Sequence, residues 1–125
     1  MTFLPKTINH DQTIGHAISL MKKLHIRHLP VMKNNKLMGI LTDRDISLVL
    51  RFIASNPDKI RVEDACSPHP YTTSPGTPLA DVVSYMAEHT IGSAIIVDNG
   101  TLVGIFTEVD AFRAIADLLE TRLKA

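Results

Sequence analysis

The sequence of 125 residues predicts a mixed α/β (α+β-like) protein, built from two βαββα motifs related by a pseudo-twofold axis and packed through their sheets. Three observations predict this architecture. The second half of the chain repeats the first, each half has two stretches with helical spacing, and each has two short apolar runs separated by turn residues. Because a unit of about 60 residues buries too little surface to be comfortable alone, we expect the two copies to form one folding unit.

The internal repeat has a period of 65 positions. Without a gap, residues 5–47 align with residues 70–112, and 11 of the 43 aligned pairs are identical. Ordinary composition would give roughly two or three identities by chance. We therefore assign the first copy to residues 1–60 and the second to residues 66–125, with a linker at residues 55–67.

Each copy is expected to open with a short extended piece, at residues 6–8 and 71–73, and to continue into a helix. In the second copy Thr77 is the candidate N-cap and Pro78 the first helical residue. The apolar residues with helical spacing are Ile14, Ala17, Ile18, Met21 and Leu24 in the first copy, and Leu79, Val82, Val83 and Met86 in the second.

Two apolar runs follow the first helix of each copy and predict a β-hairpin. They are separated by Asn34-Asn35 in the first copy and by Asn99-Gly100 in the second, pairs that tolerate the positive φ of tight turns. A second helix then closes each copy, at about residues 44–54 and 109–123. The side chains expected to face inward from these helices are Ile46, Val49, Leu50, Ile53, Phe112, Ile115 and Leu119.

Composition excludes several classes of protein. An apolar fraction of 45% excludes a mainly disordered chain, and the single cysteine excludes a disulfide framework and fits a reducing compartment. The formal net charge of zero argues against a nucleic-acid partner, although the two halves carry +4 and −4. No run approaches the roughly 20 apolar residues of a membrane span, and the N-terminus has no signal-peptide pattern. We expect a cytoplasmic protein without a membrane partner.

The most specific motif is Gly-apolar-apolar-Thr-x-x-Asp at residues 39–45, which recurs at residues 104–110. Thr42 would cap the following helix, and Asp45 would complete a capping box at its positive end. The same geometry also suits a ligand, because a helix N-terminus attracts phosphate and a carboxylate can accept two hydrogen bonds from a ribose diol. The residues alone leave both interpretations open.

This motif, together with the preceding segments 26–32 and 91–97 and the lead-in at 66–75, resembles the cystathionine-β-synthase (CBS) domain. The likeness covers nearly the whole chain, and a tandem pair of such domains is known as a Bateman module. It implies a non-catalytic regulatory sensor without an obligatory cofactor. Its ligand would be an adenosine-containing compound bound in the inter-motif clefts, namely AMP, ADP, ATP, S-adenosylmethionine, NAD or cyclic di-AMP.

The resemblance also implies partners and site residues. Such modules commonly form disc-like homodimers through their helices and act on an effector protein, here unidentified. Asp45 and Asp110 match the ribose-binding aspartate, and Thr42 and Thr107 match the hydroxyl residue near ribose or phosphate. The other matching ligand-binding positions are Thr7, Ile8 and Asn9, Arg27, His28, Leu29 and Pro30, Arg44, Thr72 and Thr73, and Gly92, Ser93 and Ala94.

The second copy departs from this pattern in its charge. The residues at the positions of Arg27, His28, Pro30 and Arg44 are Gly92, Ser93, Ile95 and Val109. Because phosphate is held best by charge-assisted donors, we expect the Asp45 cleft to hold phosphates better. The Asp110 cleft is expected to take a less charged adenosyl group or to remain empty.

Other candidates are weaker. The spacing of His25 and His28 occurs in metal sites, but no cysteine or carboxylate lies at ligand spacing, so helix-end histidines are favoured. Cys66 has no activating base nearby in sequence and is expected to be inert. The alternative function is a dimeric interaction or scaffold module that has kept the fold without sensing. The opposite charges of the halves suggest a head-to-tail dimer.

Overall fold

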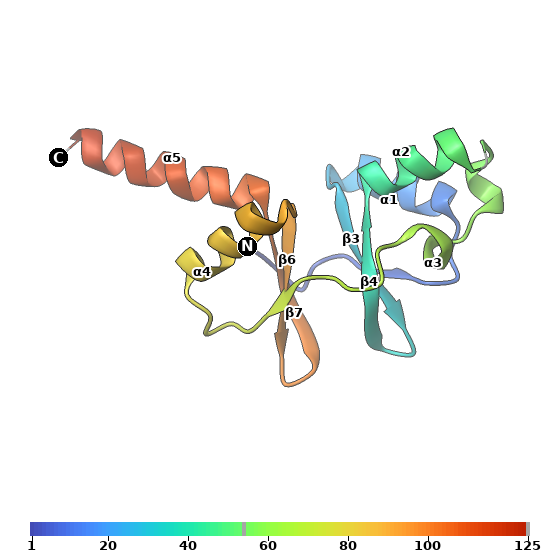
Figure 1. The fold of residues 1–125 in the computed structure, drawn as a ribbon, viewed down its shortest axis with the longest axis horizontal. Coiled ribbons are helices and arrows are strands. Elements are labelled where there is room, and N and C mark those ends of the chain that lie inside the picture. Colours follow the sequence, from blue (N-terminus) through green and yellow to red (C-terminus); the bar gives the residue numbers. More distant parts are fainter. Residues whose placement is uncertain (54, 125) are drawn as a thin grey trace. The chain divides into compact units, whose positions relative to one another are not determined.

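The computed structural model describes residues 1–53 and 55–124, and the chain divides into two compact units. The first unit is Pro5–Pro70, and the second combines Met1–Leu4 with Tyr71–Ala125. Both contain a β-sheet and helices, which confirms the mixed α/β class (Figure 1). The packing of the two sheets around a twofold axis and the boundaries drawn from the repeat stay predictions. Ala54 is the predicted end of the second helix of the first copy, and Ala125 is the predicted end of the second copy. Both lie outside the described residues.

The first unit contains a three-stranded sheet in the order β2-β3-β4. The strands are β2 (Ile8–Asn9), β3 (His28–Lys33) and β4 (Lys36–Thr42); β2 runs parallel to β3, and β3 and β4 form the predicted hairpin. Both turn residues have positive φ, 51° at Asn34 and 62° at Asn35. The helices are α1 (Ile14–Leu24), α2 (Asp43–Phe52), the 3₁₀ helix η1 (Pro57–Lys59) and α3 (Val62–Ala65).

The core of the first unit follows the predicted apolar spacing. Ile14, Ala17 and Met21 of α1 are buried, and α1 starts after its N-cap Thr13 and ends before His25, which has a φ of 54°. The linker also contributes, since Val62 has no exposed surface and joins the same cluster. The short linker is therefore part of this unit's core rather than a flexible tether.

The second unit contains a four-stranded sheet in the order β1-β7-β6-β5. Its elements are β1 (Thr2–Phe3), β5 (Thr72–Thr73), α4 (Leu79–His89), β6 (Ser93–Asp98), β7 (Thr101–Thr107) and α5 (Glu108–Lys124). The predicted start of α4 is wrong by one residue, because Pro78 is the N-cap with an extended ψ of 139°. The hydroxyl of Thr77 instead accepts a hydrogen bond from Thr73 Oγ1 at 2.6 Å.

Strand β1 was not expected from the sequence. Thr2 pairs antiparallel with Ile105 on β7, and Ser67, 65 positions after Thr2, pairs in the same way with Ile40 on β4. Ser67 and Ile40 exchange two backbone hydrogen bonds, of 2.9 and 3.1 Å. The segment that leads into each copy therefore pairs with the other copy's hairpin, as strand β1 on β7 and as a single bridge on β4.

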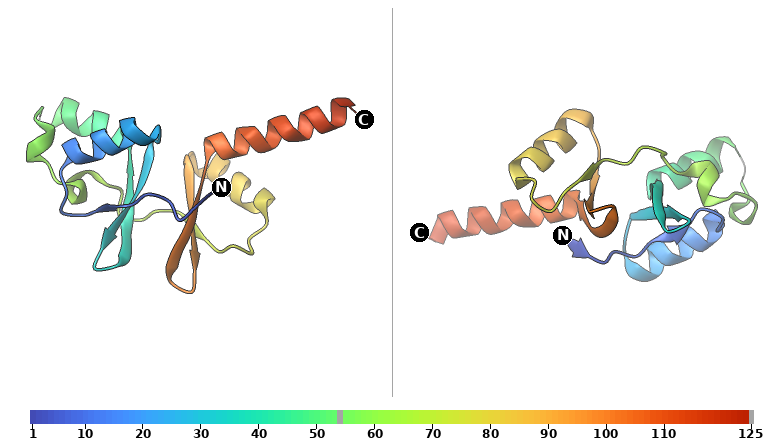
Figure 2. Two further views of the ribbon diagram at one scale, coloured as in Figure 1. Left: turned by 180° about the vertical axis from the view of Figure 1, so that it is seen from behind. Right: turned by 90° about the horizontal axis from the view of Figure 1, so that it is seen from below.

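Seven side chains on the second helix of the two copies were predicted to face inward, and this prediction is wrong for four of them. Ile53 is 74% exposed, and on α5 Phe112, Ile115 and Leu119 are 63%, 53% and 53% exposed. Among the described residues of α5, Ala111, the fourth residue of the helix, packs on the buried cluster of this unit. The helix continues past the hairpin that it would otherwise cover, as the views of Figures 1 and 2 show.

The pairing of Ser67 with β4 makes Gly39 a specific requirement. A Cβ atom at this position would overlap the backbone carbonyl oxygen of Ser67 and lie 3.2 Å from Cys66 Sγ. We expect Gly39→Ala to lower the free energy of unfolding by about 1–3 kcal/mol, because backbone cannot move aside as a side chain can. Urea unfolding followed by circular dichroism measures this change.

The matched control is Gly76→Ala, since nothing lies within 4 Å of a Cβ atom there. This control should change the free energy of unfolding by less than about 0.5 kcal/mol. Equal effects of the two substitutions would show that the contact with Ser67 does not constrain the hairpin.

Candidate functional site

The junction between β4 and α2 carries the predicted motif and forms the predicted capping box. The side chain of Thr42 accepts a hydrogen bond from the backbone N–H of Asp45 at 3.1 Å, and Asp45 Oδ2 accepts one from the N–H of Thr42 at 3.0 Å. These bonds satisfy donors that a helix start leaves unpaired. The box uses Oδ2 of the carboxylate and does not involve Oδ1, so capping fixes the orientation of Asp45 without using all its acceptor capacity.

Basic residues lie at the same end of the first sheet. His28 on β3 is paired with Thr42 on β4, and the carbonyl oxygen of Arg27 accepts a hydrogen bond from the N–H of Asp43 at 3.1 Å. The guanidinium of Arg27 is 79% exposed and lies 4.0 Å from the Asp43 carboxylate, and Arg44 in the first turn of α2 is also exposed. The structure therefore gathers one oriented carboxylate and two solvent-facing guanidinium groups around the start of α2.

The predicted adenine-pocket segment forms the edge strand of this sheet. Ile8 is buried and paired with Val31, whereas Asn9 is exposed and paired with Met32. Thr7, immediately before β2, is half-buried.

Two predicted site residues on β3 are fully buried, Leu29 and Pro30. In the second unit, Ile95 at the position of Pro30 donates its N–H to the carbonyl of Tyr71 at 2.9 Å. Proline has no N–H, so the first unit cannot form this bond to the carbonyl of Lys6. The two copies therefore differ in backbone hydrogen bonding beside the candidate site.

The second unit places its motif at the junction of β7 and α5, with a different set of hydrogen bonds and different electrostatics. Asp110 Oδ2 accepts hydrogen bonds from the N–H of Thr107 at 2.8 Å and from its hydroxyl at 3.3 Å. Asp110 Oδ1 lies 3.3 Å from the amino group of Met1, and the Asp110 side chain is 15% exposed. Both oxygens of this carboxylate therefore have a partner within the second unit.

The remaining predicted residues of the second unit follow the same register. Ser93 is paired with Thr107, and the N–H of Glu108 donates to the carbonyl of Gly92 at 3.1 Å. Ala94 is buried on β6, and Thr72 and Thr73 pair with Ile95 and Ile96 of the same strand. None of the predicted site residues Thr72, Thr73, Gly92, Ser93 and Ala94 carries a charge, and the expected difference in ligand between the copies stays a prediction.

A hydrogen-bonded acid–base pair lies beside the first site. His10, which follows β2, is 2.6 Å from the Glu63 carboxylate at the start of α3. The hydrogen bond to His10 lowers the pKa of Glu63, assisted by the charges of His10, Arg61 and Lys33. Sequence spacing could not reveal this pair, because its members are 53 positions apart.

The thiol of Cys66 does not show the features of a nucleophile. Burial raises its pKa, and the negative charges of Asp45, Glu63 and Asp64 act in the same direction. A raised pKa disfavours the reactive thiolate. Cys66 packs instead against the hairpin beside Gly39.

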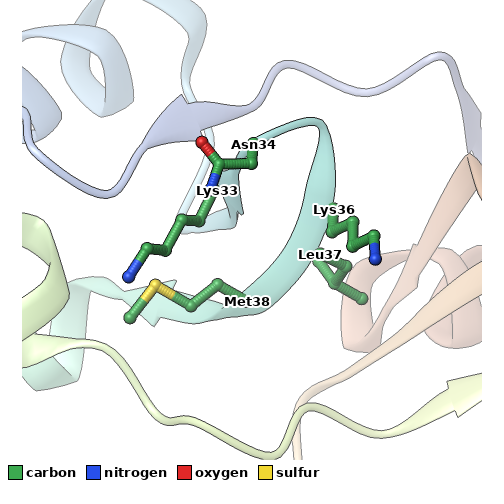
Figure 3. Close-up of a pocket in the computed structure, with 5 residues that line it drawn as sticks. All are labelled: Lys33, Asn34, Lys36, Leu37 and Met38. Atoms are coloured by element: carbon green, nitrogen blue, oxygen red, sulfur yellow. The ribbon is translucent and has the colours of Figure 1, made fainter.

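Other kinds of site find little support in residues 1–53 and 55–124. Within these residues no cluster of three or more His, Cys, Asp and Glu side chains could hold a metal ion. A search of the same residues finds no helix with the length and apolar character needed to cross a membrane. An open hollow of about 340 Å³ lies at the β3–β4 turn, where the side chains of Lys33 and Met38 extend to the same side of the hairpin (Figure 3). It contains none of the predicted site residues.

The fold and the motif define a protein built from two copies of one domain, and comparison with known families identifies that domain. The CBS domain model matches residues 1–51 and 62–117. The chain belongs to the CBS domain family. The CBS domain-containing protein YhcV of Bacillus subtilis is 39% identical over 106 residues, which are 84% of this chain and 74% of that protein.

The chain is also 36% identical over 110 residues to the inosine-5′-monophosphate dehydrogenase of Bifidobacterium longum, but it spans 19% of that enzyme's length. Two similar solved structures contain bound adenosine compounds. The CBS domain pair of protein MJ0100, in complex with 5′-methylthioadenosine and S-adenosyl-L-methionine, superposes with a TM-score of 0.81 at 27% identity and covers 93% and 92% of the two chains. CBSX2 in complex with AMP gives 0.80 at 25% identity and covers 94% and 93%.

The His10–Glu63 pair predicts a dependence of stability on pH. Because the pKa of Glu63 is lowered in the folded state, its contribution to stability is present above the unfolded pKa of about 4.3 and is lost as the pH falls through the lowered value. We expect Glu63→Gln to reduce the loss of unfolding free energy between about pH 6 and pH 3. Urea unfolding at a series of pH values measures this loss.

Glu88→Gln on α4 is the control, since it removes an exposed carboxylate from the other unit. It should leave the pH dependence close to that of the unsubstituted protein. If Glu63→Gln behaves like this control, the hydrogen bond to His10 does not contribute to acid stability.

Proposed function

We propose that this CBS protein is a regulatory sensor that binds an adenosine-containing nucleotide at the Thr42–Asp45 end of the first unit. The observation that carries the proposal is the fixed orientation of Asp45, whose capping bonds leave Oδ1 outside the box. The bound adenosine compounds of MJ0100 and CBSX2 support the same ligand class. The proposal is for a binding protein, not for an enzyme.

Each group has a distinct role in this proposal. Asp45 accepts hydrogen bonds from the ribose hydroxyls, with Thr42 close to the ribose or the phosphate. Arg27 and Arg44 are exposed and supply charge-assisted hydrogen bonds to phosphate oxygens. The segment from Thr7 to Asn9 meets the adenine through its backbone. A capping role and a ligand role are compatible for Asp45, because a carboxylate has about four acceptor positions.

We propose a weaker or different occupancy for the second motif. Asp110 already has partners on both oxygens, and an anionic ligand would find no basic residue at the positions of Gly92, Ser93 and Val109. A less charged adenosyl compound would compete with the amino group of Met1 rather than with solvent alone. The first motif therefore provides the phosphate-dependent response.

A sensor also needs a second state and a receiver. A ligand changes a conformation only by binding two states with different affinity, so the signal requires a rearrangement transmitted to a partner. We propose that the receiver is an effector protein and that the sensor acts as a homodimer, as its exposed apolar side chains on α2, α4 and α5 suggest. These surfaces equally favour the alternative, a dimeric scaffold that keeps the fold without sensing.

A thermal-shift panel separates the sensor from the scaffold. The ligands are AMP, ADP, ATP, NAD, S-adenosylmethionine and cyclic di-AMP at fixed salt. A ligand at about 100 times its Kd stabilises the folded state by about 2.7 kcal/mol, which raises the Tm by several degrees. We expect at least one ligand to give this rise in the wild type and none in Asp45→Ala.

Two controls make the result specific. Asp58→Ala removes an exposed carboxylate on η1 of the same unit and should keep the full shift. Adenosine, added to the panel as a ligand without phosphate, gives the second control: Arg44→Ala should reduce the shift for AMP more than for adenosine. Absence of a shift with every ligand at millimolar concentration would favour the scaffold.

A further inference from the structure

The first four residues of the chain lie against the motif of the second unit. Strand β1 pairs with β7, and the N–H of Leu4 donates to the carbonyl of Val103 at 3.2 Å. The side chain of Met1 lies beside Gly104, since a Cβ atom at this glycine would be 3.0 Å from Met1 Sδ. We call residues 1–4 the N-terminal strap.

The strap carries a positive charge that contacts Asp110. The amino group of Met1 lies 3.3 Å from Asp110 Oδ1, and the Asp110 side chain is largely shielded from water. Asp110 Oδ2 already accepts two hydrogen bonds from Thr107. An ion pair that is shielded from water is stronger than one at the surface. Both oxygens of the carboxylate expected to bind a ribose are therefore engaged by groups of its own unit.

The repeat shows that this contact is particular to the second unit. Cys66 stands at the position of Met1 and lies in the same way beside a glycine, 3.2 Å from a Cβ atom placed at Gly39. Its thiol is neutral at neutral pH, because burial and the negative charge of Asp45 raise its pKa. Cys66 therefore offers Asp45 no positive charge.

Exposure and backbone strain make the strap easy to release. Phe3 and Leu4 are 73% and 84% exposed, so these two side chains bury little apolar surface. Leu4 has a φ of 48°, which is unfavourable for a residue with a Cβ atom. It also precedes Pro5, and a residue before proline favours extended backbone. A short strand held in this way opens at a low cost in free energy.

We propose that the N-terminal strap is an autoinhibitory element of the second motif, in which the Met1 ammonium occupies the place of a ligand's hydroxyl donors on Asp110. This inference rests on the proposed function and adds a closed and an open state of the second motif. A neutral hydroxyl must displace a charge-assisted partner, so ligand binding requires release of the strap. The apparent affinity of such a site falls by the fraction of molecules in which it is open.

Two substitutions at Leu4 test the strap. Leu4→Pro fixes φ at about −65° and removes the N–H that bonds to Val103, so it releases the strap. Leu4→Gly suits the positive φ and keeps the strap in place. Both are made in the full chain with Asp45→Ala, so that adenosine reports on the second motif. Isothermal titration calorimetry should show that Leu4→Pro lowers the Kd for adenosine at least about tenfold and that Leu4→Gly changes it less than about twofold.

Two further variants test the role of the carboxylate and of the charge. Adding Asp110→Ala to Leu4→Pro should abolish the gain in affinity. A chain extended by Gly-Ser before Met1 keeps all residues of the strap but moves the amino group away, so it should also bind adenosine more tightly. Circular dichroism checks that every variant keeps its helix content.

Three results would overturn the strap. They are an unchanged Kd in Leu4→Pro, an equal gain in Leu4→Gly, and a gain that survives Asp110→Ala. An unchanged Kd in the extended chain would overturn the role of the Met1 ammonium.

The rise in Tm that depends on Asp45 tests the sensor separately. If this rise is present and Leu4→Pro gains nothing, the strap is wrong and the sensor stands. If Leu4→Pro gains affinity through Asp110 while no ligand gives the rise, the strap stands and sensing by the first unit is wrong. Absence of both effects overturns both proposals.

Discussion

In each unit, the segment that precedes one copy in sequence lies close to the glycine of the hairpin, and the internal structure of the unit depends on this contact. Ser67 pairs with β4 where Gly39 has no side chain, and Thr2 pairs with β7 at Ile105, next to Gly104. Each of these segments stands before one copy in sequence and belongs to the other copy's sheet in space. The chain therefore passes from one unit to the other twice. Each hairpin therefore pairs with residues that lie next to the other copy in sequence, which helps to explain why a small repeat is used as a pair.

The same seven-residue motif joins stability to binding chemistry. Its glycine admits the crossing segment, its apolar residues enter the core, and its threonine and aspartate cap the helix that follows. A side chain that caps a helix has already lost its rotamer freedom, so a ligand that uses the remaining oxygen of Asp45 does not have to order it again. Thr42 and Asp45 can therefore cap the helix and bind a ligand at the same time. The cap provides the preorganisation that a ribose-binding carboxylate needs.

Local signals in the sequence predicted much of this structure, and the failures have a common cause. The hairpins and the capping box of Thr42 and Asp45 depend on residues within a few positions, so spacing and turn chemistry revealed them. Strand β1 and the His10–Glu63 pair depend on partners that are far away in sequence, and no local pattern marks them. The inward assignment of Phe112, Ile115 and Leu119 on α5 failed for a different reason. Their helical spacing was recognised, but spacing cannot say whether a stripe faces its own sheet or another molecule.

Differences between the two copies show where function has been added to a common fold. One repeat position illustrates this, since Arg44 in the first copy aligns with Val109 in the second. In the proposed function Arg44 supplies charge to a phosphate, whereas Val109 is an apolar residue, 53% exposed, at the start of α5 and belongs to the surface proposed for assembly. Linkage then connects the two roles. If nucleotide binding alters the packing of α5, dimerisation must alter nucleotide affinity by the same factor, because a coupling free energy acts equally in both directions. A protein divided in this way can sense with one copy and report through the other.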